Sequence, residues 1–419
     1  MRSNYIFVVD LGSSKLACCL VEMKDRKRIK NIFFDCLPVA VLNHTGIKDL
    51  SGLKVSLIDL KDRVAKKTGI KVHDVYLSFF SSDLIMRYNS AVIPLAERGN
   101  KLITACDLQR VNEQAIALAN FWEEEIIHSI AVSYSVDDKD GFINPLGMYA
   151  HKLEVELFTI SIKSAHLETF HRLFNKLGFE LKRIFIPGID ILNYILRKEN
   201  LNKGMYVLLD IGAEISEVVI YEDKKILHVG AIPLGGNEFT KRLSQQFNIS
   251  FEMAEELKNN YGTILEESIL KDKEIMIKDI NLYRRISNLK LCQILKDEAE
   301  KFLISLKDYL KRTVEGKRID RIFVCGKTAL LDGLLEKIEL DLEVNVRMLS
   351  YNDFPFFSNP PLSSLLSLPQ FLDYLNCLQV VYEVVQNSKR RSFVSSVLSK
   401  DGLFKRGIDW IQRLYQEYF

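Results

Sequence analysis

Two stretches of this 419-residue chain, about 200 residues apart, share one strand–turn–strand design. In each, an apolar strand ends in an aspartate, a glycine-containing turn follows, and a second apolar strand returns. The first stretch is residues 5–23 with Asp10, and the second is residues 205–221 with Asp210. β-Branched and apolar runs joined by a glycine turn are typical of buried hairpins. The sequence therefore predicts two related halves, each built on such a hairpin.

A third strand-and-turn segment strengthens this interpretation. Residues 321–325 form an apolar strand pattern, followed by a Gly-Lys-Thr turn and an apolar helix pattern from about 330 to 340. A single aspartate after a strand would most simply be a turn former, which Asp does well. Two such hairpins followed by a glycine-containing strand–helix turn instead predict an α/β fold. Its strand ends carry carboxylates into a cleft between the halves.

Between and after the hairpins, strand and helix signals alternate. Strands are predicted at 75–80 and 153–162, where apolar residues alternate with polar ones or form a short run. A helix is predicted up to residue 119, with Thr104 as its cap and an acid three residues later. Residues 283–312 have the charged, periodic pattern of one long helix.

The composition excludes several classes of protein. Lys plus Arg number 57 against 55 for Asp plus Glu, so no positive excess is present to neutralise nucleic-acid phosphates. The seven cysteines include no CxxC pair, which argues against zinc ribbons and favours reduced thiols. No HExxH or GxSxG motif is present. Apolar runs stay short of the roughly 18 residues of a membrane helix, and Asp10 and Lys15 interrupt the signal-like amino terminus. We therefore expect a cytoplasmic protein.

The turn after the first strand has the residue types that phosphate chemistry requires. Backbone N–H groups, small hydroxyls and a lysine bind phosphates, and carboxylates hold Mg²⁺ through water. The turn after Asp10 offers all of the phosphate-binding groups: Gly12, Ser13, Ser14 and Lys15. Asp10 and Asp210 are the candidate Mg²⁺ carboxylates.

A glycine- and proline-punctuated stretch at 127–148 is the most specific motif. Its matched positions are Ile127, His128, Ser129, Ile130, Tyr134, Ser135, Val136, Asp137, Asp140, Gly141, Asn144, Pro145, Leu146, Gly147 and Met148. The stretch is similar to a signature of FtsA, a bacterial cell-division family within the actin/Hsp70/hexokinase ATPase superfamily. The resemblance covers the chain from residue 5 to the carboxyl terminus. It implies a duplicated actin-like (ribonuclease H-like) α/β ATPase fold, with an inserted α+β subdomain of the FtsA 1C type and a C-terminal amphipathic helix.

The resemblance also divides the chain into subdomains. Subdomain 1C is the part implied to serve division-protein interaction and polymerisation, and 2B the part implied to receive the tail of the tubulin-like protein FtsZ. The implied ranges are 1–80 and 164–197 for 1A, 81–163 for 1C, 198–235 and 319–385 for 2A, 236–318 for 2B, 386–401 for a linker, and 402–419 for a membrane-targeting helix.

The resemblance implies ATP and Mg²⁺ as ligands of the cleft. Carried over position by position, its nucleotide contacts are Asp10, Gly12, Ser13, Ser14, Lys15, Asp210, Gly212, Gly235, Gly236, Asn237, Glu255, Lys258 and Gly326. Asp10 and Asp210 would hold Mg²⁺ through water.

This chain departs from the family pattern in two turns. Where the family has Gly-Gly-Gly-Thr or Gly-Ala-Gly-Thr, this chain has Gly-Ala-Glu-Ile, with Glu214 and Ile215. At about 4 Å and an effective dielectric constant near 20, a carboxylate facing a phosphate oxygen costs about 4 kcal/mol. Ile215 also removes a hydroxyl donor, and Lys327 replaces a glycine that would lie near the base. We expect nucleotide binding without rapid hydrolysis, so the protein would be at most a weak ATPase.

The last eighteen residues form an amphipathic helix pattern behind the polar, serine-rich segment 386–401. The bulky apolar side chains fall on one half of a helical wheel: Leu403, Phe404, Ile408, Trp410, Ile411, Leu414, Tyr415, Tyr418 and Phe419. A terminal helix docked on the core is the plainer alternative. The aromatic face and the seven Lys/Arg against three Asp/Glu over 386–419 favour an anionic membrane surface.

Together, these features predict an actin-like adaptor on the cytoplasmic face of the inner membrane at the division septum. The resemblance implies that it tethers FtsZ, recruits later divisome proteins and assembles into actin-like filaments, with ATP as an assembly ligand. No nucleic acid is expected as a partner. The alternative is a PilM-like adaptor of a type IV pilus, which the C-terminal pattern and the 127–148 signature disfavour. A sugar kinase or chaperone ATPase is disfavoured by the altered second turn and by the absence of a chaperone-type substrate domain.

Overall fold

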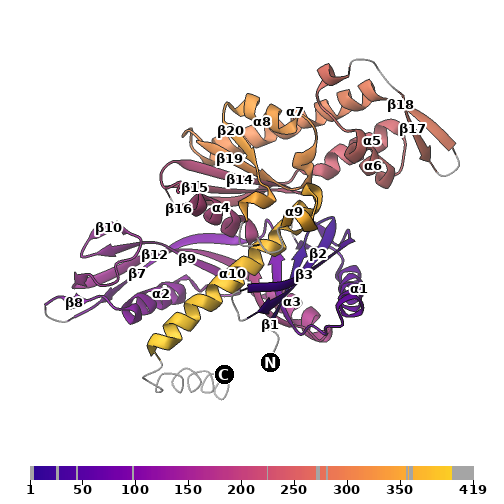
Figure 1. Ribbon diagram of the computed structural model, residues 1–419. Helices are drawn as coiled ribbons and strands as arrows, with labels where there is room; N and C mark the ends of the chain where they lie inside the picture. Colours follow the sequence, from indigo (N-terminus) through magenta and orange to yellow (C-terminus); the bar gives the residue numbers. More distant parts are fainter. Residues whose placement is uncertain are drawn as a thin grey trace.

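The structure is a computed structural model of the chain. It describes residues 4–24, 28–43, 46–96, 99–223, 225–269, 274–279, 282–354, 357 and 362–398. Figure 1 shows two lobes, with the carboxyl-terminal helix α10 (Leu368–Leu398) running from their junction along the lower lobe.

The lower lobe is built on a five-stranded sheet in the order β13-β6-β1-β2-β3. Its strands are β1 (Asn4–Leu11), β2 (Lys15–Lys24), β3 (Arg28–Pro38), β6 (Asp74–Phe79) and β13 (Glu180–Phe185). The three strands β1, β2 and β3 are antiparallel neighbours, whereas β6 and β13 run parallel to β1. Side chains on both faces of β1 and β2 are buried, as expected for strands covered on both sides, so the first predicted hairpin is confirmed.

The upper lobe repeats this arrangement. Its sheet has the order β16-β15-β14-β19-β20. Its strands are β14 (Met205–Ile211), β15 (Ser216–Glu222), β16 (Lys225–Ile232), β19 (Arg321–Cys325) and β20 (Asn345–Met348). Again three strands are antiparallel neighbours and two run parallel to the first. Read from the antiparallel edge, both sheets have one order and one set of directions, so the predicted duplication is confirmed.

An inserted unit follows β6 in the lower lobe. It contains β7 (Ile85–Pro94), β8 (Lys101–Leu102), α2 (Ala105–Ala119), β9 (Glu124–Val136), β10 (Lys139–Phe142), β11 (Tyr149–Ala150) and β12 (Lys152–Lys163). Helix α2 packs on the sheet β10-β9-β12-β7 around a separate apolar cluster. The predicted cap is present, because Thr104 and Asp107 form a reciprocal capping box at the start of α2.

A second insertion follows β16 in the upper lobe. It contains α5 (Gly236–Phe247), α6 (Phe251–Tyr261), η1 (Glu266–Ser268), β17 (Glu274–Asp279), β18 (Leu282–Ser287) and α7 (Asn288–Thr313). The prediction of a helix at 283–312 was wrong for its first residues. Its first residues pair with β17 as strand β18, and Ser287 then caps α7 by accepting a hydrogen bond from the Lys290 N–H.

The remaining elements cover or connect the sheets. They are β4 (Leu42–Asn43), β5 (Gly46–Ile47), α1 (Leu50–Thr68), α3 (Ser164–Lys176), α4 (Pro187–Lys198), η2 (Lys327–Leu330), α8 (Leu334–Leu342), η3 (Tyr351–Asp353) and α9 (Leu362–Leu365). The helix predicted from 330 begins four residues later, because Gly333 adopts φ 87° and interrupts the helical backbone.

Helix α10 changes the interpretation of the chain's last part. It packs against β1, β2 and α4 and continues to Leu398, so most of the predicted linker at 386–401 is helical. Residues 386–398 contain neither Gly nor Pro, so nothing in the local sequence ends the helix. The predicted membrane-targeting helix at 402–419 lies outside the described residues. Within the described part, no helix is both long and apolar enough to span a bilayer.

Candidate nucleotide site

A cavity of about 1010 Å³ opens between the two lobes, where the hairpin turns of both halves meet. Twelve of the thirteen residues proposed from sequence line it: Asp10, Gly12, Ser13, Ser14, Lys15, Asp210, Gly212, Gly236, Asn237, Glu255, Lys258 and Gly326. Gly235 is absent from this lining and is the cap residue of α5. The cavity is large enough for a nucleotide-sized ligand.

The two hairpin turns have the same internal hydrogen bond. The Gly12 N–H donates to the Lys15 carbonyl over 3.0 Å, and the Gly212 N–H donates to the Ile215 carbonyl over 3.0 Å. The turns also meet across the cavity, because the Glu214 N–H donates to Ser13 Oγ over 3.3 Å. Each lobe therefore contributes one tight glycine turn to one shared wall.

Three carboxyl groups with a raised pKa line the cavity: those of Asp10, Asp210 and Glu217. Asp10 is buried, accepts a hydrogen bond from Ser78 Oγ and lies 3.5 Å from Asn376 Nδ2. Burial raises the pKa of Asp10, and burial together with the Asp10 charge raises the pKa of Asp210 to about 6. Burial and both neighbouring acids raise the pKa of Glu217 well above its ordinary value. Acids that resist ionisation in this way favour a bound cation.

Glu217 was missed at the sequence level although it lines the cavity. It lies directly opposite Asp210 in the β14–β15 ladder, whereas the corresponding partner of Asp10 is Ala17. The signal that could have found it is this register. A polar residue at the cross-strand position of a buried aspartate faces the same side of the sheet.

Lysines from both lobes reach the cavity. Lys15 Nζ lies 2.9 Å from Asp373 Oδ1, and Lys327 Nζ lies 2.8 Å from Asp373 Oδ2. Asp373, which the sequence reasoning also missed, belongs to α10. Lys327, which replaces a glycine of the family pattern near the base, pairs here with this carboxylate.

The altered second turn places Glu214 in the cavity lining. Asn237 Nδ2 donates to Glu214 Oε1 over 2.6 Å, so the carboxylate is held toward the start of α5. The bond satisfies one carboxylate oxygen but leaves the negative charge in the cavity.

The α5–α6 side of the cavity is held by one buried ammonium group. Lys258 Nζ donates to the Gly236 carbonyl at 3.0 Å, to Thr240 Oγ1 at 2.8 Å and to Glu255 Oε2 at 2.7 Å. Burial lowers the pKa of Lys258. The pairing with Lys258 outweighs burial at Glu255 and lowers the pKa of that carboxyl. This network fixes the position of α6 relative to the glycine that begins α5.

Gly326 lies closer to the end of β14 than a residue with a side chain could. Its φ of 86° and ψ of 149° are reached almost only by glycine. A Cβ there would lie 2.4 Å from the Ile211 carbonyl oxygen and 2.5 Å from Asp210 Oδ1. The turn after β19 therefore packs directly against the turn after β14.

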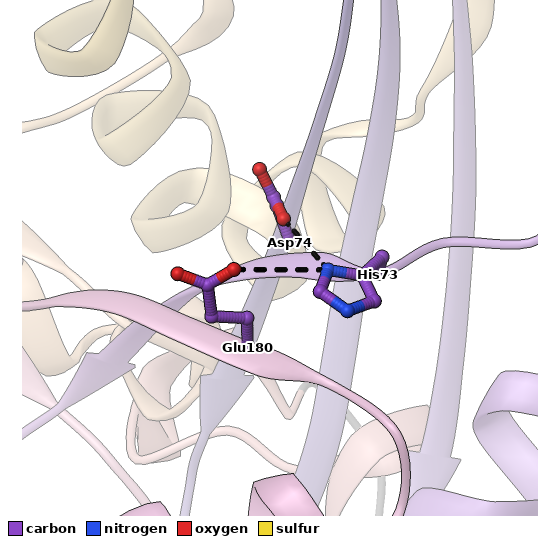
Figure 2. Close-up of side chains that lie close together, drawn as sticks. All are labelled: His73, Asp74 and Glu180. Atoms are coloured by element: carbon purple, nitrogen blue, oxygen red, sulfur yellow. Dashed lines mark hydrogen bonds and ion pairs between the residues drawn. The ribbon is translucent and has the colours of Figure 1, made fainter.

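A second polar cluster consists of His73, Asp74 and Glu180 at the surface (Figure 2). It lies at the start of β6, whereas the cavity-lining residue Ser78 lies near the end of that strand. His73 Nδ1 lies 2.9 Å from Asp74 Oδ1 and 3.9 Å from Glu180 Oε2. Lys182 Nζ already pairs with both acids, at 3.5 Å from Asp74 and 2.6 Å from Glu180. All three drawn side chains are more than half exposed, so the cluster is explained as a solvated ion-pair network.

Comparison with known families identifies the chain. A model described as "Cell division protein FtsA" matches residues 207–367, and a model described as "SHS2 domain inserted in FTSA" matches residues 82–161. Together they cover more than half of the chain. The chain belongs to the FtsA family.

FtsA relatives match along most of their length. FtsA of Buchnera aphidicola subsp. Baizongia pistaciae is 22% identical over 343 residues, which cover 81% of this chain and 80% of the relative. FtsA of Bacillus subtilis is 23% identical, with coverage of 84% and 80%. FtsA of Borreliella burgdorferi is 23% identical over 412 residues, with coverage of 95% and 98%. The predicted membership in this cell-division family is thus confirmed.

Among solved structures, a PilM–PilN type IV pilus biogenesis complex matches 90% of this chain and 98% of the other chain. The TM-score is 0.60 and the identity is 15%, so this likeness concerns the fold alone. The FtsA-family chain therefore has an actin-like ATPase fold with an inserted SHS2 domain.

Proposed function

We propose that this FtsA-family chain binds ATP with Mg²⁺ in the cavity between its lobes. The observation that supports this best is the convergence of two glycine turns, two lysines and three acids with a raised pKa on one cavity. Backbone N–H groups and lysines suit phosphate oxygens, and buried carboxylates suit Mg²⁺. The groups present therefore fit the ligand.

Each group has a distinct role in this proposal. Lys15 and the N–H groups of both turns would bind the phosphates, and Asp10, Asp210 and Glu217 would hold Mg²⁺. Bound Mg²⁺ supplies positive charge that offsets both the acids and the phosphates. Glu255, Lys258 and Gly326 would flank the nucleoside. Nine side chains or turns from two lobes would thus close on one ligand.

We infer that ATP acts as an assembly and conformational ligand more than as a fuel. Ile215 offers no hydroxyl in the second turn, and Glu214 adds a negative charge beside the phosphates. Both features disfavour the build-up of charge that phosphoryl transfer requires.

Calorimetric titration with ATP and Mg²⁺ tests nucleotide binding. The parent protein should bind, and Lys15→Ala should bind at least about tenfold more weakly, because a charge-assisted contact with phosphate is lost. Asp62→Asn, an exposed carboxylate change on α1, is the matched control and should bind like the parent. Equal affinity of the parent and Lys15→Ala would count against this site.

We further propose that the chain links FtsZ to the inner membrane at the division site, recruits later divisome proteins and self-associates. Membership in a cell-division family supports this. The amphipathic pattern at 402–419 would dock on anionic lipid, and α10 leads toward it from the cavity. The FtsZ tail is expected on residues 236–318.

Vesicle sedimentation tests the membrane tether. The full chain should sediment with phosphatidylglycerol vesicles and stay free of phosphatidylcholine vesicles, and deletion of 402–419 should release it. A deleted chain that sediments as well as the full one would contradict the tether.

A labelled peptide of the FtsZ carboxyl terminus should bind the full chain and should compete with unlabelled peptide.

A further inference from the structure

Asp373 joins cations from both lobes of the protein. Its Oδ1 lies 2.9 Å from Lys15 Nζ, which follows β1, and its Oδ2 lies 2.8 Å from Lys327 Nζ, which follows β19. The carboxylate is only 12% exposed. One side chain of α10 therefore bridges the turn after β1 in the lower lobe and the turn after β19 in the upper lobe.

The bridge uses the groups that phosphate would need. Lys15 Nζ also lies 3.5 Å from the Leu372 carbonyl, so two of its partners belong to α10. Burial acts to lower the pKa of Lys15, and the carboxylates of Asp373, Asp10 and Asp210 together more than reverse that effect, with Asp373 as the largest contributor. Each ammonium has three donors, and a carboxylate competes with phosphate for them.

We propose that Asp373 is an internal competitor of the nucleotide phosphates, and that its displacement couples the cavity to helix α10. This inference rests on the proposed ATP binding. Phosphates that approach Lys15 and Lys327 meet both the existing ion pairs and the negative charge of Asp373. Asp373 therefore sets the affinity for phosphate-bearing ligands.

Because Asp373 belongs to α10, displacement of its carboxylate by phosphate acts directly on that helix. Leu372, Asp373 and Asn376 all line the cavity, and α10 continues without interruption from Leu368 to Leu398. The helix packs on β1, β2 and α4 along the way. Because binding linkage is reciprocal, a ligand that changes the position of α10 changes nucleotide affinity by the same factor.

Titration with ATP and Mg²⁺ tests the competition, with adenosine as a phosphate-free probe. Asp373→Asn keeps the side-chain shape and removes the charge. It should bind ATP about tenfold more tightly than the parent, the change that corresponds to one charge-assisted hydrogen bond. Its affinity for adenosine should equal that of the parent. Asp373→Glu keeps the charge and should bind ATP like the parent, as should the control Asp62→Asn.

Hydrogen exchange tests the coupling. In the parent, ATP should change amide exchange within 368–386, whereas Asp373→Asn should show the changed pattern without ATP.

Equal or weaker ATP binding by Asp373→Asn, while the parent binds, would overturn the competition. An exchange pattern in α10 that ATP leaves unchanged in the parent would overturn the coupling. Failure of the parent and of Asp373→Asn to bind ATP would remove the proposed nucleotide site, and this inference with it.

Discussion

Replacing Asp210 by Asn should make the Mg²⁺-free protein more stable at neutral pH. Burial and the neighbouring Asp10 raise the pKa of Asp210 from 3.8 to about 6. Ionising this group therefore costs more in the folded chain than in the unfolded chain, where the pKa is ordinary. Each pKa unit corresponds to about 1.4 kcal/mol, so the folded state loses up to about 3 kcal/mol once Asp210 is fully charged.

The pH dependence of this effect has a definite sign. The unfolded chain releases its proton first, so stability falls as the pH rises from about 4 to about 6. Asn carries no such proton. The gain in free energy of unfolding for Asp210→Asn should be about 3 kcal/mol at pH 7.5 and roughly half of that at pH 5.

Urea unfolding in EDTA at the two pH values measures the gain. Asp62→Asn is the control and should change stability at neither pH. Mg²⁺ added at pH 7.5 should reduce the difference in free energy of unfolding between the parent and Asp210→Asn, because Mg²⁺ favours the ionised form of Asp210. A gain that is absent, or that is the same at both pH values, would refute the reasoning about burial.

Three further changes test other parts of the structure. Gly326→Ala should lower the free energy of unfolding by about 1–3 kcal/mol in urea unfolding, because its backbone conformation is strained for alanine and its Cβ would press on the Ile211 carbonyl. Thr104→Ala should cost about 1 kcal/mol through the lost cap of α2, measured as faster amide exchange confined to the inserted unit; uniform exchange rates would contradict the capping role. Glu214→Gly should tighten ATP binding in calorimetry, and equal affinity would show that the bond from Asn237 already turns the charge from the phosphates.

Local sequence patterns were sufficient for the hairpins and the glycine turns. Apolar runs that end in Asp10 and Asp210 define the ends of β1 and β14 without any knowledge of packing. The ends of helices were harder to predict from local patterns than the hairpins, because the first residues of the 283–312 pattern form a strand only through their pairing with β17. The helical conformation of residues 386–398 was not predicted, since polar composition does not end a helix that lacks Gly and Pro.

Two members of the candidate site could not be found from local patterns. Glu217 belongs to the acid group through its cross-strand register with Asp210. Asp373 follows Lys15 by 358 positions, and only the packing of α10 on β1 and β2 brings the two together. A sequence motif predicts which ligand one turn can bind. The places of Glu217 and Asp373 in the cavity instead depend on how elements that are distant in the sequence pack together.

The unequal partners of the two hairpin aspartates give the cleft a direction. A perfectly repeated pair of hairpins would present the same surface from either side, and an elongated ligand could lie either way round. Ala17 opposite Asp10 and Glu217 opposite Asp210 remove that equivalence, because the carboxyl group of Glu217 lines the cavity whereas Ala17 does not. Duplication built the two walls, and this divergent cross-strand position, together with the divergent turn residues, distinguishes them.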